Sequence, residues 1–112
     1  MTLNADEIRI FGLKSCDTCR KAMKACTGAQ LVDVRETSVP EDILRAALDA
    51  FGDALVNRKS TTWRGLDETS RALSPEVLVA AHPAVMKRPL VAEGDRLFLG
   101  WTDEVRRALG LA

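Results

Sequence analysis

The stretch IRIFGLKSCDTCRK, residues 8–21, decides how this chain begins to fold. Residues 8–11 predict a short apolar strand, Gly12 allows a turn, and a basic helix begins at Cys16. A cysteine at a helix N-terminus faces the free backbone N–H groups of the first turn and the positive end of the helix dipole. Both favour the thiolate, which is the nucleophilic form of cysteine. The stretch therefore predicts a reactive thiol at Cys16.

The composition indicates one domain spanning residues 1–112, because 46% of the residues are hydrophobic and the chain is long enough for a core. Sixteen basic and sixteen acidic side chains balance, so no bulk charge favours nucleic acid or an anionic membrane as a partner. There is neither a signal peptide pattern nor an apolar run of the roughly 20 residues that span a bilayer. We expect a cytoplasmic monomer. Three cysteines then indicate reactive or buried thiols.

The first half of the chain has the pattern of a βαβ unit followed by a helix. Apolar residues at helical spacing predict a helix over residues 16–26, and residues 30–34 predict a strand parallel to the first. Ser38 and Glu41 have the spacing of a capping box, which predicts a helix over residues 40–50. Residues 58–65 are polar, basic and β-branched, and we expect a surface loop there.

The last third of the chain carries cap and strand signals. They predict a helix after the N-cap Ser74 ending near residue 82, a hairpin of strands 90–92 and 97–99, and a helix capped by Thr102 that continues to residue 109. The order βαβ, helical insertion, ββα is that of the thioredoxin fold, an α/β class with a mixed sheet. A CxxC at the first strand-to-helix junction is where that fold keeps its chemistry.

Two further cysteines follow Cys16 on the same predicted helix. Cys19 lies one turn on, where it can close a disulfide with Cys16 and resolve a mixed disulfide. It also begins the apolar face of the helix, so the alternative is a buried thiol without a role. Cys26 lies on that face and is expected in the core. One CxxC with a distant His82 lacks the four ligands of a structural zinc site, so no metal is expected.

Cationic side chains suggest an anion site beside Cys16. Lys14 adds positive charge near the thiolate, Arg58 opens the polar loop, and Arg88 precedes Pro89 at the start of the third strand. A guanidinium group offers a rigid fork to a carboxylate, phosphate or arsenate, and a proline fixes the local backbone. Because the topology brings both arginines to the cysteine end of the sheet, we expect them to bind an anionic substrate.

Several segments in order resemble the arsenate reductase (ArsC) family, which includes Spx-like and YffB-like branches. They are residues 12–18, 57–68, 82–91 and 97–101, and the resemblance covers essentially the whole chain. The motifs Ser-Thr-Thr-Trp-Arg and Leu-Gly-Trp look most like the YffB-like branch. The resemblance implies a thioredoxin-like domain with a helical insertion, Cys16 as nucleophile and Pro89 as the cis-proline of the fold. It also implies that Arg58 and Arg88 bind an oxyanion or glutathione.

Two features depart from the pattern of arsenate reductases that use glutaredoxin. Those proteins carry a third arginine where this chain has Leu99-Gly100, with Arg96 nearby in the turn. The YffB-like pattern has a single cysteine at the junction, whereas Spx-like regulators carry the CxxC that Cys19 completes here.

The leading hypothesis is a thiol-dependent oxidoreductase with no bound cofactor and with glutathione as co-substrate. Its substrate would be a small thiol or oxyanion, and glutaredoxin is a possible partner. The alternatives are an arsenate reductase coupled to glutathione or glutaredoxin, and an Spx-like redox-sensing regulator that binds RNA polymerase.

Overall fold

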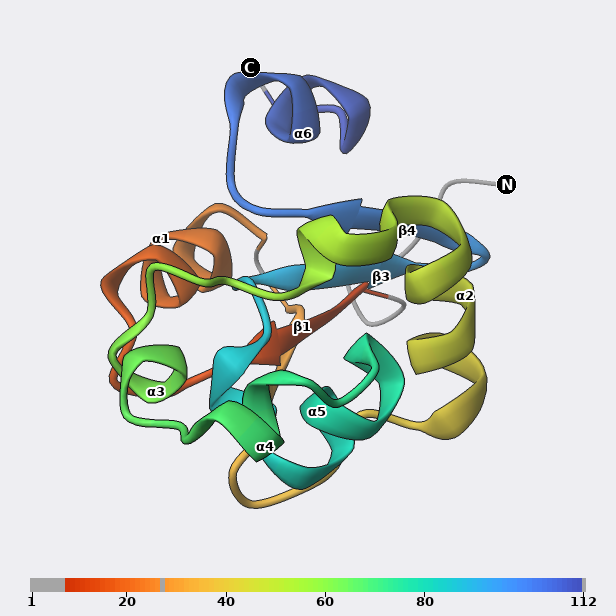
Figure 1. The fold of residues 1–112 in the computed structure, drawn as a ribbon. Helices are drawn as coiled ribbons and strands as arrows, with labels where there is room; N and C mark the ends of the chain where they lie inside the picture. The colour runs from red at the N-terminus through yellow and green to blue at the C-terminus, as the bar shows by residue number, and fades with distance from the viewer. Residues whose placement is uncertain (1–7, 27, 112) are drawn as a thin grey trace.

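A four-stranded mixed sheet forms the centre of the molecule (Figure 1). The computed structural model describes residues 8–26 and 28–111. The strands lie in the order β2-β1-β3-β4. β1 (Ile8–Gly12) pairs in parallel with β2 (Gln30–Asp33) and antiparallel with β3 (Leu90–Glu93), which pairs antiparallel with β4 (Arg96–Leu99). The predicted α/β class, the parallel βαβ unit and the hairpin are confirmed.

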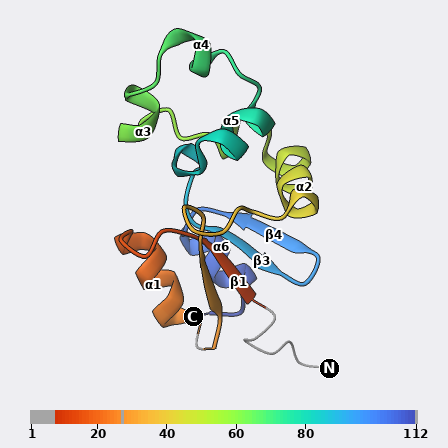
Figure 2. The same cartoon turned by 90° about the horizontal axis from the view of Figure 1, so that it is seen from below.

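Helices cover both faces of the sheet because its strands alternate their apolar side chains between the faces (Figure 2). Ile10 and Val91 pack on one face in a core that includes residues of α1 (Asp17–Ala25). Leu109, just after α6 (Asp103–Ala108), packs against the same core. Phe11 and Leu90 pack on the other face against the insertion.

The insertion is built of short helices joined by turns. They are α2 (Glu41–Phe51), η2 (Gly52–Leu55), α3 (Thr61–Arg64), α4 (Glu68–Arg71), α5 (Pro75–Ala81) and η3 (Pro83–Val85). An isolated antiparallel bridge between Val56 and Met86 ties the residue after η2 to the residue after η3. No helix in residues 8–26 and 28–111 combines the length and the hydropathy needed to cross a bilayer.

The predicted capping box before α2 is wrong. Pro40 is the N-cap, and no side chain caps this helix end. With Ser38 as N-cap, Val39 would have to be helical, but a residue before proline is driven to extended backbone. The helix therefore starts at Glu41. The two other predicted caps have the right positions: Thr102 accepts a hydrogen bond from the Val105 N–H, whereas the Ser74 hydroxyl makes no cap bond.

The predicted loop over residues 58–65 is also wrong in part, because α3 lies inside it. The Ser60 hydroxyl caps α3 by accepting the N–H of Trp63 at 3.1 Å. Trp63 is half-buried and packs against the core of the insertion, and this tertiary contact stabilises a sequence of low helix propensity. Helix α4, which Asp67 caps, was not predicted.

Candidate active site

The turn after β1 places Cys16 at the N-terminus of α1. The Cys16 N–H donates to the Leu13 carbonyl at 3.0 Å, which closes the turn. Cys16 itself is extended, with φ −86° and ψ 120°, and is the N-cap residue of the helix. Its thiol makes no cap hydrogen bond of good geometry, but the N–H groups of Cys19 and Thr18 lie near enough to favour a negative sulfur. The predicted junction of strand, turn and cysteine is present.

The surroundings of Cys16 favour its thiolate. Burial by itself raises the pKa of this half-buried thiol, but the N–H and thiol of Cys19, the N–H of Thr18 and the charge of Arg88 together outweigh burial. The net result is a Cys16 pKa below its ordinary value. The structure thus gives this sulfur the electrostatic environment of a nucleophile.

Cys19 lies in a different environment although it neighbours Cys16. Its side chain is fully buried, and burial with the adjacent Cys16 sulfur raises its pKa to about 11. Gly12 makes room for it, because a Cβ on Gly12 would collide with the Cys19 sulfur. Cys26 is buried in the core beside α1, as predicted, and burial and the nearby Glu93 raise its pKa. Only Cys16 among the three cysteines combines exposure with a lowered pKa.

Arg88 and Pro89 lie against the cysteine turn at the start of β3. The Arg88–Pro89 peptide bond is cis, as the family resemblance implied, and Pro89 is buried. The half-buried Arg88 donates from Nη1 to the Ala84 carbonyl at 2.9 Å, which fixes the direction of its side chain. Its positive charge favours the thiolate of Cys16. The structure therefore brings two of the predicted site residues, Cys16 and Arg88, together.

Arg58 lies two residues after the Val56–Met86 bridge, in the turn that precedes α3. The Asn57 N–H donates to the Val85 carbonyl at 2.7 Å, which ties the start of this turn to η3, the helix whose Ala84 carbonyl holds Arg88. Arg58 is exposed, and its guanidinium lies 5.3 Å from the ring centre of Trp63. An aromatic face can hold a guanidinium group ready for an anion without using its N–H donors.

Lys14 and Arg96, the two other cations considered from the sequence, bind partners other than the thiol. Lys14 pairs its ammonium with Glu36 at 2.9 Å on the surface, and this hydrogen bond and charge raise the pKa of Lys14. Arg96 binds Glu93 at 3.1 Å and the carbonyl of Ala108 at 2.9 Å. Because Glu93 pairs with Ile8, the first residue of β1, Arg96 lies at the end of the sheet opposite to Cys16. It does not take the place of a third arginine at the thiol.

Sequence reasoning missed Asp33, a buried carboxylate at the end of β2 that binds the backbone of the cysteine turn. Oδ2 of Asp33 accepts the N–H of Lys14 at 3.0 Å. An aspartate at the carboxyl end of a strand parallel to β1 was the available signal, since such ends meet at one edge of the sheet.

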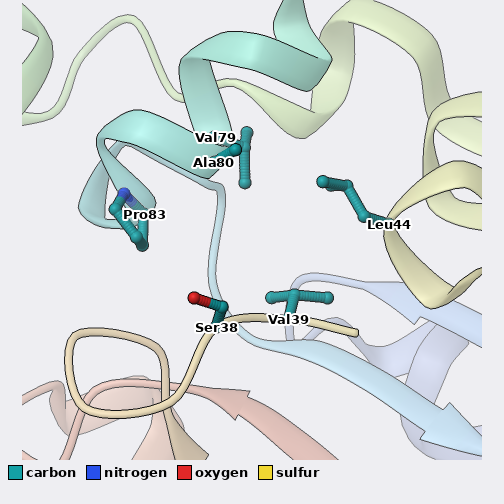
Figure 3. Close-up of a pocket in the computed structure, with 6 residues that line it drawn as sticks. All are labelled: Ser38, Val39, Leu44, Val79, Ala80 and Pro83. Atoms are coloured by element: carbon teal, nitrogen blue, oxygen red, sulfur yellow. The ribbon is translucent and has the colours of Figure 1, made fainter. Parts of the chain in front are cut away.

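A small hollow between the insertion and the segment that precedes α2 is not the substrate site (Figure 3). It has a volume of about 70 Å³ and is lined by Ser38, Val39, Leu44, Val79, Ala80 and Pro83. Pockets for small-molecule ligands have volumes of about 300–1,000 Å³, and none of the predicted site residues lines this one. Within the described residues, no cluster of three or more His, Cys, Asp or Glu side chains is arranged to hold a metal ion.

Comparisons with known proteins agree with this architecture. An uncharacterized protein of Haemophilus influenzae is 34% identical over 90% of this chain and 96% of its own length. The global transcriptional regulator Spx 2 of Bacillus anthracis is 27% identical over 85% of this chain and 80% of its own length.

Solved structures have the same fold. The YffB protein superposes with a TM-score of 0.77 at 28% identity, covering 90% of this chain and 96% of that one. An arsenate reductase (ArsC) related protein of Brucella melitensis has a TM-score of 0.64 at 26% identity, with coverages of 90% and 92%. The model of the ArsC family matches residues 11–109, which include the end of β1, the cysteine turn, the insertion and strands β2, β3 and β4. This chain has the thioredoxin-like fold and belongs to the ArsC family, a family of thiol oxidoreductases.

Proposed function

We propose that this protein is a glutathione-linked thiol oxidoreductase that reduces mixed disulfides of glutathione. The observation that carries the proposal is the position of the Cys16 sulfur, which lies half-buried at the N-terminus of α1 with Arg88 close enough to favour its thiolate. A thiolate is both a strong nucleophile for a disulfide sulfur and a good leaving group in the next exchange.

The reaction consists of two thiol–disulfide exchanges. The Cys16 thiolate attacks the glutathione sulfur of a mixed disulfide, a bond forms between Cys16 and glutathione, and the substrate leaves as a thiolate that takes a proton from water. A second glutathione, as thiolate, attacks the sulfur bound to Cys16 and leaves as oxidised glutathione. Cys16 is regenerated as a thiolate, so the two electrons come from glutathione and no bound cofactor is needed.

Arg88 and Arg58 bind the glutathione portion in this proposal. Glutathione carries two carboxylates, and each is a partner for the forked donors of a guanidinium group. Arg88 is fixed on the Ala84 carbonyl, and Arg58 is held over the ring of Trp63. Pro89, buried at the start of β3, fixes the backbone that carries Arg88. Lys14, turned to Glu36, adds positive charge at a greater distance.

The assay uses the purified protein with glutathione, a glutathione mixed disulfide of a small thiol, and glutathione reductase to follow oxidised glutathione. Turnover that disappears in Cys16→Ser and persists in Cys26→Ser supports the proposal. The absence of turnover with wild-type protein, with or without added glutaredoxin, contradicts it. We expect activity of a monomer in the reducing cytoplasm, which gel filtration and cell fractionation would test.

A second candidate function is redox-dependent regulation of transcription. The similarity to Spx 2 and the contact between the Cys16 and Cys19 thiols favour it. Binding of this protein to RNA polymerase in a pull-down that depends on the oxidation of both cysteines would support the regulator. A protein that turns over the mixed disulfide and does not bind polymerase supports the enzyme.

A further inference from the structure

Asp33 ends β2 with a carboxylate that is almost completely removed from solvent, with 5% of its side chain exposed. A buried carboxylate is costly unless hydrogen bonds compensate for its lost hydration. Here Oδ2 accepts the N–H of Lys14 and Oδ1 accepts the N–H of Arg35, both at 3.0 Å. These hydrogen bonds, above all that from the Lys14 N–H, hold the pKa of Asp33 below its ordinary value. The carboxylate is therefore charged and connects two loops.

The loop after β2 is attached to the cysteine turn by contacts of unequal burial. The Asp33 carboxylate binds the backbone of Lys14, the Arg35 side chain donates to the Ser15 hydroxyl at 3.2 Å, and Glu36 pairs with the Lys14 ammonium at 2.9 Å. The last two contacts lie on the surface, where water and salt weaken them. Of these three contacts, the hydrogen bond from the Lys14 N–H to the buried Asp33 carboxylate is the one that water does not weaken.

Lys14 is the first central residue of the turn that the Cys16 N–H closes on Leu13. A hydrogen bond to the Lys14 N–H therefore fixes the plane of the Leu13–Lys14 peptide, which begins the turn that ends at the nucleophile. The orientation of the turn sets the extended backbone of Cys16 and so directs its sulfur to the N–H groups of Thr18 and Cys19.

We propose that Asp33 is a positioning residue for Cys16. Through the Lys14 amide it holds the turn in which the Cys16 sulfur meets the helix N-terminus, and it thereby increases the thiolate population. The proposal uses the proposed function only in taking Cys16 as the nucleophile. The charged and titratable groups around this region are Arg88 and the Cys19 thiol near Cys16, and Arg35 and Lys14 near Asp33. Glu36 pairs with the Lys14 ammonium, and Arg20, which pairs with Asp17, donates to the Lys14 carbonyl at 2.8 Å.

The sign of the effect separates positioning from simple electrostatics. A carboxylate acting on Cys16 through its charge would repel the thiolate, so removing that charge would lower the Cys16 pKa. A carboxylate that positions the turn has the opposite effect. Asp33→Ala then raises the Cys16 pKa, and Asp33→Asn, which keeps one acceptor oxygen, raises it by a smaller amount.

The experiment measures iodoacetamide labelling of Cys16 against pH in the Cys19→Ser, Cys26→Ser background, without glutathione. In Asp33→Ala we expect labelling at pH 7 to slow by about 3–10-fold, since one pKa unit changes the thiolate population tenfold. Glu36→Gln is the matched control, because it removes the exposed contact to the same lysine, and its rate should equal that of the parent.

Circular dichroism and urea unfolding establish that each variant is folded, and Asp33→Asn provides the measurement if Asp33→Ala does not fold. An unchanged or lowered Cys16 pKa in a folded Asp33 variant overturns the proposal. Because the readout is alkylation, a protein without glutathione turnover contradicts the proposed function and leaves this test intact.

Discussion

At the scale of residues, three cysteines on one helix differ in reactivity because each meets a different environment. Cys16 faces N–H groups and the charge of Arg88, Cys19 is fully buried behind it, and Cys26 lies in the core near Glu93. The pKa of Cys16 is lowered, whereas the pKa of each of the others is raised. Local placement within about three helical turns thus decides which sulfur has its thiolate favoured.

Cys16 is expected to react first with iodoacetamide. Its lowered pKa leaves more thiolate below the ordinary thiol value of about 8.5, while Cys19 stays protonated and covered. Peptide mapping after brief labelling between pH 6 and pH 8, an interval below that value, measures the order of reaction. Labelling of Cys19 or Cys26 ahead of Cys16 in the folded protein would contradict this expectation.

Mild oxidation should join Cys16 to Cys19. The Cys19 thiol hydrogen-bonds to the Cys16 sulfur, so the two atoms need only a small adjustment to reach bonding distance. Mass spectrometry after peroxide treatment should show this disulfide and a reduced Cys26. If Cys16 is found only as a sulfenic acid or a glutathione adduct, Cys19 is a structural thiol.

Arg88 should contribute more to anion binding than Arg58. Arg88 is half-buried and held by the Ala84 carbonyl, whereas Arg58 is exposed, so ordering Arg58 on binding costs more entropy. Arg88→Ala should weaken glutathione binding by about 1–3 kcal/mol, the range for a charged hydrogen-bond partner, and Arg58→Ala by less. Calorimetry measures both. Equal binding by the wild type and Arg88→Ala would remove Arg88 from the site.

At the scale of elements, β1 and α1 approach closely because Gly12 has no side chain. A Cβ at this position would meet the sulfur and Cβ of Cys19, which is itself fully buried. The close approach of β1 and α1 therefore requires the small size of Gly12. It does not require the conformational freedom of glycine, because the backbone of Gly12 is outside the left-handed region.

Gly12→Ala should destabilise the protein by about 1–3 kcal/mol, the usual cost of overpacking a core. Urea unfolding measures the loss of free energy. Gly65→Ala is the control, since a Cβ there would meet only ordinary contacts beyond 3.4 Å and the φ of Gly65 is −81°. A Gly12→Ala protein as stable as the control would show that Cys19 can move away without cost.

At the scale of the whole molecule, the register of the sheet places Leu99 and Arg96 at opposite ends of the sheet. Leu99 pairs with Leu90, which pairs with Phe11, so Leu99 lies at the Cys16 end of the sheet and packs against the same core. Arg96 lies at the other end with Glu93. The position that the family resemblance assigns to a third arginine is therefore near the thiol but carries no charge.

Arsenate reduction by the unmodified protein should be weak or absent. Negative charge gathers on several oxygens in that reaction, and each missing donor costs about a hundredfold to a thousandfold in rate. Leu99→Arg should raise arsenate turnover relative to Leu99→Gln, which controls for the loss of apolar packing. Robust arsenate turnover by the wild type that the added arginine does not change would show that a third arginine is not required here.

The strand, turn and cysteine of residues 8–21 could be predicted from the sequence because their signals are local: an apolar run, a glycine and a cysteine at a helix start. The βαβ unit and the hairpin follow from the same kind of signal. The family resemblance added the cis peptide bond before Pro89. The capping box failed because Pro40 overrides the spacing of Ser38 and Glu41.

The tertiary structure alone decided which cations reach the thiol and what holds its turn. Lys14 is two residues from Cys16 but pairs with Glu36, while Arg88 is 72 residues away and favours the thiolate. Asp33 gains its place only when β2 lies parallel to β1 and its carboxylate meets the Lys14 amide. Local sequence patterns determine backbone dihedral angles and which face of a helix or strand is apolar. The partners of charged groups depend on contacts between distant segments, and those contacts exist only after the sheet has formed.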